Sequence, residues 1–224
     1  MNIKEGNFLG HTVKSYDKDL QSISKTLDEM LELVIESIDM VAQMFKTRDQ
    51  NLIEKITAHD YKINSLDHLI EKKVTAILAL RQPMAVDLRY TISSLKVSSN
   101  LERSGDQAKS IIRKIARLEQ ENFANDIEQS LISMIELSKT MAKEAITAFN
   151  NHDLDLANLV LKQDDEIDKI YSDLFRIIDH ENFNRKEVKQ ITNILFIAKS
   201  FERLADHSTN IAEIAGFVVT GEIK

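Results

Sequence analysis

Two acidic segments, one hundred residues apart, carry carboxylates at a spacing that could bind a cation. NLERSGDQAKSI contains Glu102 and Asp106, and SFERLADHSTNI contains Glu202 and Asp206 at the same offset. Residues at i and i+4 lie on one face of a helix, so the two carboxylates of each pair project together. Because like charges at this spacing repel by roughly 0.2–0.5 kcal/mol on an isolated helix, a shared cation is the obvious compensation.

Further oxygen ligands stand near both pairs. Asn210 continues the line of the second pair by another turn, and Ser110 does the same in the first copy. The preceding helical segments align with each other and supply Asp60 in the first half and Asp164 with Asp168 in the second. Carboxylate, amide and hydroxyl oxygens are the ligands that hard cations prefer.

The alternative is that these acids are only solvated. The chain has other acidic pairs at i and i+4, such as Asp67 with Glu71, and most such pairs are exposed and balanced by nearby Lys or Arg. The repetition in both halves, rather than the spacing itself, favours a cation site. His207 is adjacent to Asp206 but points about 100° away around the helix, so we expect an exposed or hydrogen-bonding histidine rather than a ligand.

Three other residues in the acidic segments have structural interpretations. We expect Arg103 and Arg203 to form ion pairs with carboxylates of neighbouring helices. Gly105, in the middle of a helical segment, is less favourable than Ala by about 0.5–1 kcal/mol, and its small size would permit the close approach of a helix or an ion. Its counterpart is Ala205, which keeps the position small.

The elements that must position these residues are predicted to be helices throughout. Apolar residues recur at helical spacing and no segment shows sustained strand alternation. The expected helices span about 20–45, 52–80, 84–118, 127–149, 155–177 and 184–218. Because the order of long helix, long helix, break and long helix occurs twice, the sequence predicts an all-α protein of two tandem three-helix bundles, residues 1–120 and 121–224.

Capping residues mark the breaks between these helices. Asp49 and the segment NNHDLD can cap the second and fifth helices, and Asn184 followed by Glu187 resembles a capping box. Pro83 suits the first turn of the third helix.

Composition narrows the class of protein. Five Gly and one Pro in 224 residues agree with helices, and the absence of Cys removes disulfides and thiolate chemistry. No apolar leader or long apolar run is visible, so we expect a soluble cytoplasmic protein without direct membrane insertion. A net charge of −7 argues against nucleic acid as a partner. No Glu-x-x-His pair, Gly-rich phosphate loop or Ser/His/Asp arrangement is present, so the chain does not read as an enzyme.

Two segments resemble the PhoU family, the phosphate-signalling accessory proteins of bacteria. RQPMAVDLRYTISSLKVSSNLERSGDQAKSI is similar to the third helix of that family, and FERLADHSTNIAE is similar to the sixth. The arrangement of six helices in two repeats and the length of the chain also agree with that family, so the resemblance covers nearly the whole chain. It implies two three-helix bundles that carry multinuclear clusters of iron, zinc, manganese or magnesium.

The resemblance also implies which residues bind metal. The family ligands fall on two acidic pairs and on the acids of the second helix in each repeat: Glu102, Asp106, Glu202, Asp206, Asp60, Asp164 and Asp168, with Asn210 beside the second pair. Asn64 stands where the family pattern prefers Asp, and Ser110 stands where the second repeat has Asn210. Both departures weaken the first site, so we expect the second repeat to hold metal better.

The function that the resemblance implies is negative regulation of phosphate uptake. Such a protein would couple the ATPase subunit of a phosphate ABC transporter to a sensor histidine kinase, as a homodimer held at the inner membrane face by protein contacts. Two alternatives stay open: an accessory protein of a low-affinity phosphate permease, and a helical scaffold that binds no metal.

Overall fold

The computed structural model describes residues 14–118, 125–179 and 185–222. Within these ranges the chain forms helices and no strand, which confirms the all-α prediction. The helices are α1 (Lys14–Thr47), α2 (Asn51–Arg81), α3 (Ala85–Ile115), α4 (Asn125–Asn151), α5 (Leu154–Asp179) and α6 (Arg185–Thr220).

Local capping chemistry sets two of the helix starts. The backbone nitrogen of Asn51 donates to Asp49 Oδ1 at 3.0 Å, and that of Leu156 donates to Asp153 Oδ1 at 2.9 Å. Each side-chain oxygen satisfies a donor that the first turn leaves unpaired. The predicted cap at Asn184 lies outside the described residues.

The third helix begins within one residue of its predicted start, but Pro83 lies outside it. Gln82 has a positive φ of 49° and ends α2, and Met84 is extended with a φ of −127° as the N-cap residue of α3. Pro83 therefore precedes the helix instead of lying in its first turn. The chain uses residues 82–84 to reverse direction between the antiparallel helices α2 and α3. The spacing of apolar residues does not predict the length of such a connection.

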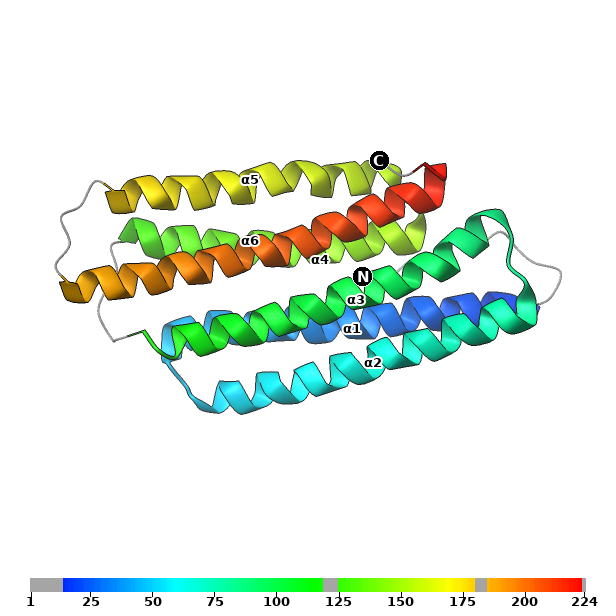
Figure 1. Cartoon of the computed structure of the whole chain (residues 1–224), viewed down its shortest axis with the longest axis horizontal. Helices are drawn as coiled ribbons and strands as arrows, with labels where there is room; N and C mark the ends of the chain where they lie inside the picture. The colour runs from blue at the N-terminus through cyan, green and yellow to red at the C-terminus, as the bar shows by residue number, and fades with distance from the viewer. Residues whose placement is uncertain (1–13, 119–124, 180–184, 223–224) are drawn as a thin grey trace.

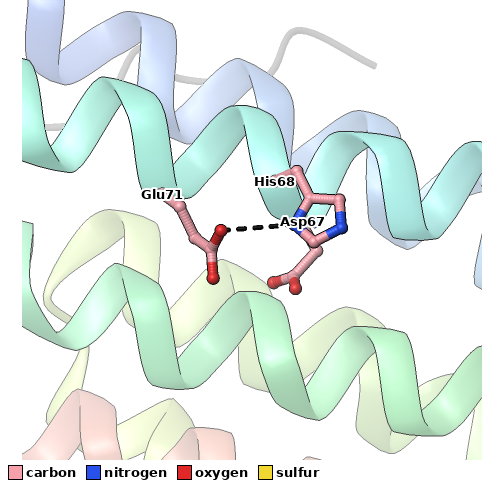
Figure 2. A group of neighbouring side chains, drawn as sticks. All are labelled: Asp67, His68 and Glu71. Atoms are coloured by element: carbon pink, nitrogen blue, oxygen red, sulfur yellow. Dashed lines mark hydrogen bonds and ion pairs between the residues drawn. The ribbon is translucent and has the colours of Figure 1, made fainter.

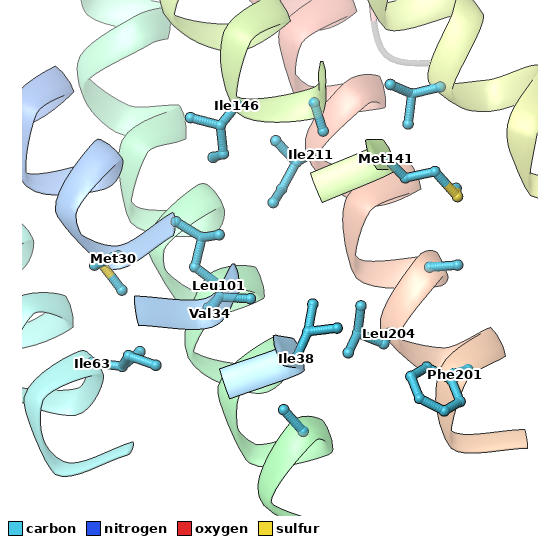
Figure 3. Close-up of a cluster of buried hydrophobic side chains, with 14 of the residues drawn as sticks. Met30, Val34, Ile38, Ile63, Leu101, Met141, Ile146, Phe201, Leu204 and Ile211 are labelled. Carbon is cyan, nitrogen blue, oxygen red and sulfur yellow. The ribbon is translucent and has the colours of Figure 1, made fainter. Parts of the chain in front are cut away.

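The two repeats lie side by side with their long axes roughly parallel (Figure 1). Helices α1, α2 and α3 pack on one another, as do α4, α5 and α6, while α3 packs along α6 and α1 against α4. The buried apolar side chains form one core that continues through both repeats, and Figure 3 shows its middle. The boundary that we expect between residues 120 and 121 lies outside the described residues, so the division into two domains stays a prediction.

The helices α3 and α6, which carry the acidic pairs, are thus central to the molecule (Figure 1). Arg89 joins the start of α3 to the end of α6, because its Nε donates to the Val218 carbonyl at 2.8 Å and its Nη2 to the Val219 carbonyl at 3.3 Å. Across the described residues, every helix falls short of the combined length and apolarity that spanning a membrane requires.

The approach of α2 to α3 is close at Gly105. A Cβ atom on this residue would lie 2.8 Å from Cδ1 of Ile63, a side chain of α2 that is 1% exposed. A helix rather than an ion therefore takes the space beside Gly105. This contact sets the register in which the acids of α2 meet those of α3.

Candidate metal centre

Each repeat brings acids of its second and third helices together. We call Asp60, Glu102 and Asp106 the first cluster, between α2 and α3, and Asp164, Asp168, Glu202 and Asp206 the second cluster, between α5 and α6. Carboxylates of the neighbouring helix help to raise the pKa of Glu102 in the first cluster and of Asp164 and Asp206 in the second. Among the described residues, no three ligand atoms of either cluster lie within 4.8 Å of one another, so the structure places these acids near each other without closing a metal site.

The first cluster is built around a buried carboxylate. Asp60 is 6% exposed, and Nζ of Lys109 lies 2.5 Å from its Oδ2. The same nitrogen lies 2.7 Å from Asp106 Oδ1, one turn away on α3. Burial raises the pKa of Glu102, and the charges of Asp106, Asp67 and Asp60 raise it further. One ammonium group thus compensates part of the repulsion in this cluster.

The second cluster concentrates more negative charge. Burial raises the pKa of Asp206, and the carboxylates of Glu202, Asp164 and Asp168 raise it further. The pKa of Asp164 is raised by burial and by acidic neighbours, although contact with the Thr209 hydroxyl opposes that shift. These raised pKa values mean that Asp164 and Asp206 are charged against the field of their acidic neighbours. A cation at this place would relieve that repulsion.

Lys199 is the cation that the structure places beside the second cluster. It forms an ion pair with Glu202 from the preceding turn of α6, and its side chain is 42% exposed. Screening by water weakens a pair this exposed. The lysine beside the second cluster is therefore more exposed to water than Lys109, whose side chain is 19% exposed.

Asn210 turns away from the second cluster. Its amide nitrogen donates to Asn100 Oδ1 on α3 at 3.4 Å, so the side chain reaches the other repeat. A residue eight positions after Glu202 is rotated by about 80° around a helix of 3.6 residues per turn. This rotation places the Asn210 side chain at the α3–α6 interface instead of beside Glu202.

His207 also lies apart from the second cluster, as its spacing predicts. It is half-buried rather than exposed, and its Nδ1 atom has no hydrogen-bond partner within the described part of the chain. Burial and the charge of Arg103 on α3 lower the pKa of this histidine to about 4. His207 is therefore neutral at pH 7, and its side chain is half-buried because α6 turns this face toward α3.

The predicted ion pairs of Arg103 and Arg203 are absent from residues 14–118, 125–179 and 185–222. Both side chains are exposed. Each lies on the side of its helix that faces the other repeat, where Arg103 acts on His207 and Arg203 acts on Lys114. The sequence could not reveal this, because the neighbour of each arginine depends on how the two repeats pack.

A third acidic group lies on α2. Asp67, His68 and Glu71 offer three ligand atoms that all lie within 4.8 Å of one another, and Figure 2 shows them projecting from one stretch of the helix. His68 Nδ1 lies 3.2 Å from Glu71 Oε2, and both side chains are more than half exposed. The spacing of Asp67 and Glu71 predicts a solvated pair, and the intervening His68 is the signal for a third ligand atom. Asp67 also borders the first cluster, because its charge acts on Glu102.

Known proteins share both the sequence pattern and the fold. Residues 27–115 and 131–215 each match the family described as PhoU domain. The "Phosphate-specific transport system accessory protein PhoU homolog" of Caulobacter vibrioides is 35% identical over 213 residues, which cover 95% of this chain and 93% of that protein.

Two solved structures have the same architecture. PhoU from Pseudomonas aeruginosa superposes with a TM-score of 0.82 at 28% identity, over 92% of this chain and 100% of the other. The phosphate transport system regulatory protein PhoU from Streptococcus pneumoniae gives a TM-score of 0.81 at 28% identity, over 93% and 99%. Since both repeats match and the alignments cover nearly all of each chain, this protein belongs to the PhoU family.

Proposed function

We propose that this protein is a negative regulator of phosphate uptake that acts as an accessory of a phosphate-specific transport system. It binds the ATPase subunit of the phosphate ABC transporter and a sensor histidine kinase, and it holds starvation signalling off when phosphate is plentiful. It acts as a homodimer, at the cytoplasmic side of the inner membrane, through these protein contacts and not as an enzyme.

One observation carries this proposal. The similarity to phosphate-specific transport accessory proteins extends over both repeats and leaves almost none of either chain uncovered. A shared fold alone would say little about function, because one fold serves many functions. Here the acidic pairs of α3 and α6 stand at matching positions within the two matched regions.

The second part of the proposal is that divalent or trivalent metal binds to the clusters unequally. Asp164, Asp168, Glu202 and Asp206 would hold it in the second repeat, through oxygen atoms suited to iron, zinc, manganese or magnesium. Asp60, Glu102 and Asp106 form the weaker set. A metal ion bound there would neutralise carboxylates of two helices and so fix α5 against α6.

A genetic experiment tests the regulatory role. We expect that deletion of the gene switches on phosphate-starvation genes in phosphate-rich medium, and that the wild-type gene restores repression. Unchanged expression after deletion would contradict the proposal. The permease alternative predicts instead that deletion alters low-affinity uptake without altering these genes.

A matched pair of variants tests the contribution of the second cluster to regulation. Glu202→Ala with Asp206→Ala is expected to restore repression poorly, because the cluster loses two of its four carboxylates. Glu32→Ala with Glu36→Ala is the control, since it removes the same charge at the same spacing from exposed positions of α1. Equal restoration by both variants, at equal protein levels, would favour the metal-free scaffold.

A further inference from the structure

A lysine side chain lies inside the first cluster, where carboxylates from two helices meet. Nζ of Lys109 is 2.5 Å from Asp60 Oδ2 and 2.7 Å from Asp106 Oδ1. The side chains of Asp60 and Lys109 are 7% and 19% exposed, so this ion pair is largely withdrawn from water. Charge-assisted hydrogen bonds of this kind are short and strong, and they hold α2 to α3.

The second repeat has no charge at the corresponding position. Thr209 stands one hundred residues after Lys109, and its hydroxyl oxygen lies 3.1 Å from the carbonyl oxygen of Ala205 in its own helix. The short threonine side chain leaves Asp164 and Asp206 without the ammonium group that joins Asp60 to Asp106. The repeats therefore differ in where their lysine lies: Lys109 joins acids of two helices in the first repeat, whereas Lys199 pairs with Glu202 of its own helix in the second.

An ammonium group and a metal ion cannot share these oxygen atoms. Metal–oxygen distances of about 2.0–2.6 Å would place a divalent ion almost where the Lys109 nitrogen lies. Two positive charges so close, and so little exposed to water, repel strongly. A metal ion could bind Asp60 and Asp106 only if the lysine left its pair, and the departing ammonium group would lose both of its carboxylate partners.

We propose that Lys109 takes the place of the metal ion in the first repeat, so that, of the two clusters, the second binds divalent metal and the first does not. The part that concerns the second cluster rests on the proposed function. The part that concerns Lys109 rests on the geometry of the first cluster and is testable separately.

Two reciprocal substitutions test this by giving each repeat the residue type of the other at positions 109 and 209. Lys109→Thr is expected to open the first cluster, so that the Mn²⁺ bound per chain rises to about twice the wild-type value. Thr209→Lys is expected to reduce Mn²⁺ bound at the second cluster to roughly a tenth or less at the same free concentration. Calorimetric titration of the purified full chain with Mn²⁺ measures both. Lys96→Thr and Thr192→Lys are the matched controls, because they make the same changes at exposed positions of the same helices, and neither should alter Mn²⁺ binding.

Thermal unfolding gives a second readout. Without metal, Lys109→Thr should melt at a lower temperature than wild type, because Asp60 stays buried without a partner. Added Mn²⁺ should restore the melting temperature of this variant. If Lys109→Thr fails to fold, Lys109→Gln keeps a hydrogen-bonding side chain of similar length and should bind more Mn²⁺ than Lys96→Thr does. Lys109→Arg, which keeps the charge, should gain no Mn²⁺.

The outcomes separate the two proposals. A wild-type protein that loses its Mn²⁺ in Thr209→Lys, together with a folded Lys109→Thr that gains none, would overturn the role of Lys109 and leave the second cluster intact as a metal site. A wild-type protein that binds no Mn²⁺, together with a Lys109→Thr variant that does, would support Lys109 as the replacement cation and refute metal binding at the second cluster. Mn²⁺ binding by neither protein would refute both.

Discussion

The contact between Gly105 and Ile63 provides a quantitative test of how α2 and α3 pack. Gly105→Ala adds a Cβ atom 2.8 Å from Cδ1 of Ile63, a buried side chain whose end must shift to admit it. Overpacking of this kind is unfavourable by about 1–3 kcal/mol, while the gain in helix propensity is about 0.5–1 kcal/mol. The variant should therefore lose about 0–2.5 kcal/mol of the free energy of unfolding.

Shortening Ile63 should reverse the sign of this effect. Ile63→Val removes Cδ1 and alone destabilises the protein by about 0.5–1.5 kcal/mol. The next atoms of Ile63 lie at 3.8 and 3.9 Å from the added Cβ, which are ordinary contacts. Once Cδ1 is absent, Gly105→Ala should stabilise the protein by about 0.5–1 kcal/mol, which gives a coupling of about 1–3 kcal/mol between the two sites.

Urea unfolding of the four proteins in this double-mutant cycle, followed by circular dichroism, measures the coupling. Ala205→Gly, at the matching position of α6, is the control. It should destabilise the protein by about 1 kcal/mol and add to Ile63→Val without coupling. Additive effects of Gly105→Ala and Ile63→Val, within about 0.5 kcal/mol, would refute the close approach of the two helices at this point.

Two further predictions concern charges at helix contacts. Burial and the charge of Glu32 raise the pKa of Asp28 from 3.8 to about 6, although a hydrogen bond from Asn150 opposes the shift. Because the folded state then holds this proton more tightly than the unfolded state, stability should fall as the pH rises from about 4 to about 6. Asp28→Asn should remove this pH dependence and, after allowance for solvent screening, stabilise the protein at pH 7 by about 1 kcal/mol. Urea unfolding at several pH values measures the change in stability. A variant less stable than wild type at pH 7 would contradict the argument. Arg89→Gln loses the charge-assisted hydrogen bond to the Val218 carbonyl, so it should destabilise the protein by about 1.5–3 kcal/mol. Hydrogen exchange of the backbone amides at the end of α6 should also become faster. Unchanged exchange rates there would count against the contact.

Local features of the fold could be predicted from the sequence because their causes are local. Apolar periodicity predicts the helices, and the side chains of Asp49 and Asp153 cap α2 and α5 as their types and positions suggest. The pairing of acids within each repeat followed from i, i+4 spacing and from the alignment of the two halves. These inferences needed no knowledge of how the helices pack.

Features that depend on packing could not be predicted in the same way. Lys109 meets Asp60 across 49 residues of sequence, and that meeting depends on the register of α2 against α3. Asn210 shares a helix with Glu202, yet the rotation of α6 carries its amide to Asn100. Arg103 likewise faces the other repeat, where its charge acts on His207. The sequence therefore predicted which residues are chemically important better than it predicted their partners.

The central claim is that the two acidic clusters are unequal and that the second is the metal site. Elemental analysis of purified wild type, Glu102→Ala with Asp106→Ala, and Glu202→Ala with Asp206→Ala, each loaded with the same metals, tests it most directly. We expect bound divalent metal in wild type, most of it retained by the first variant and most of it lost by the second. Absence of metal from wild type under every loading condition, equal losses in the two variants, or a greater loss from the first would contradict the claim.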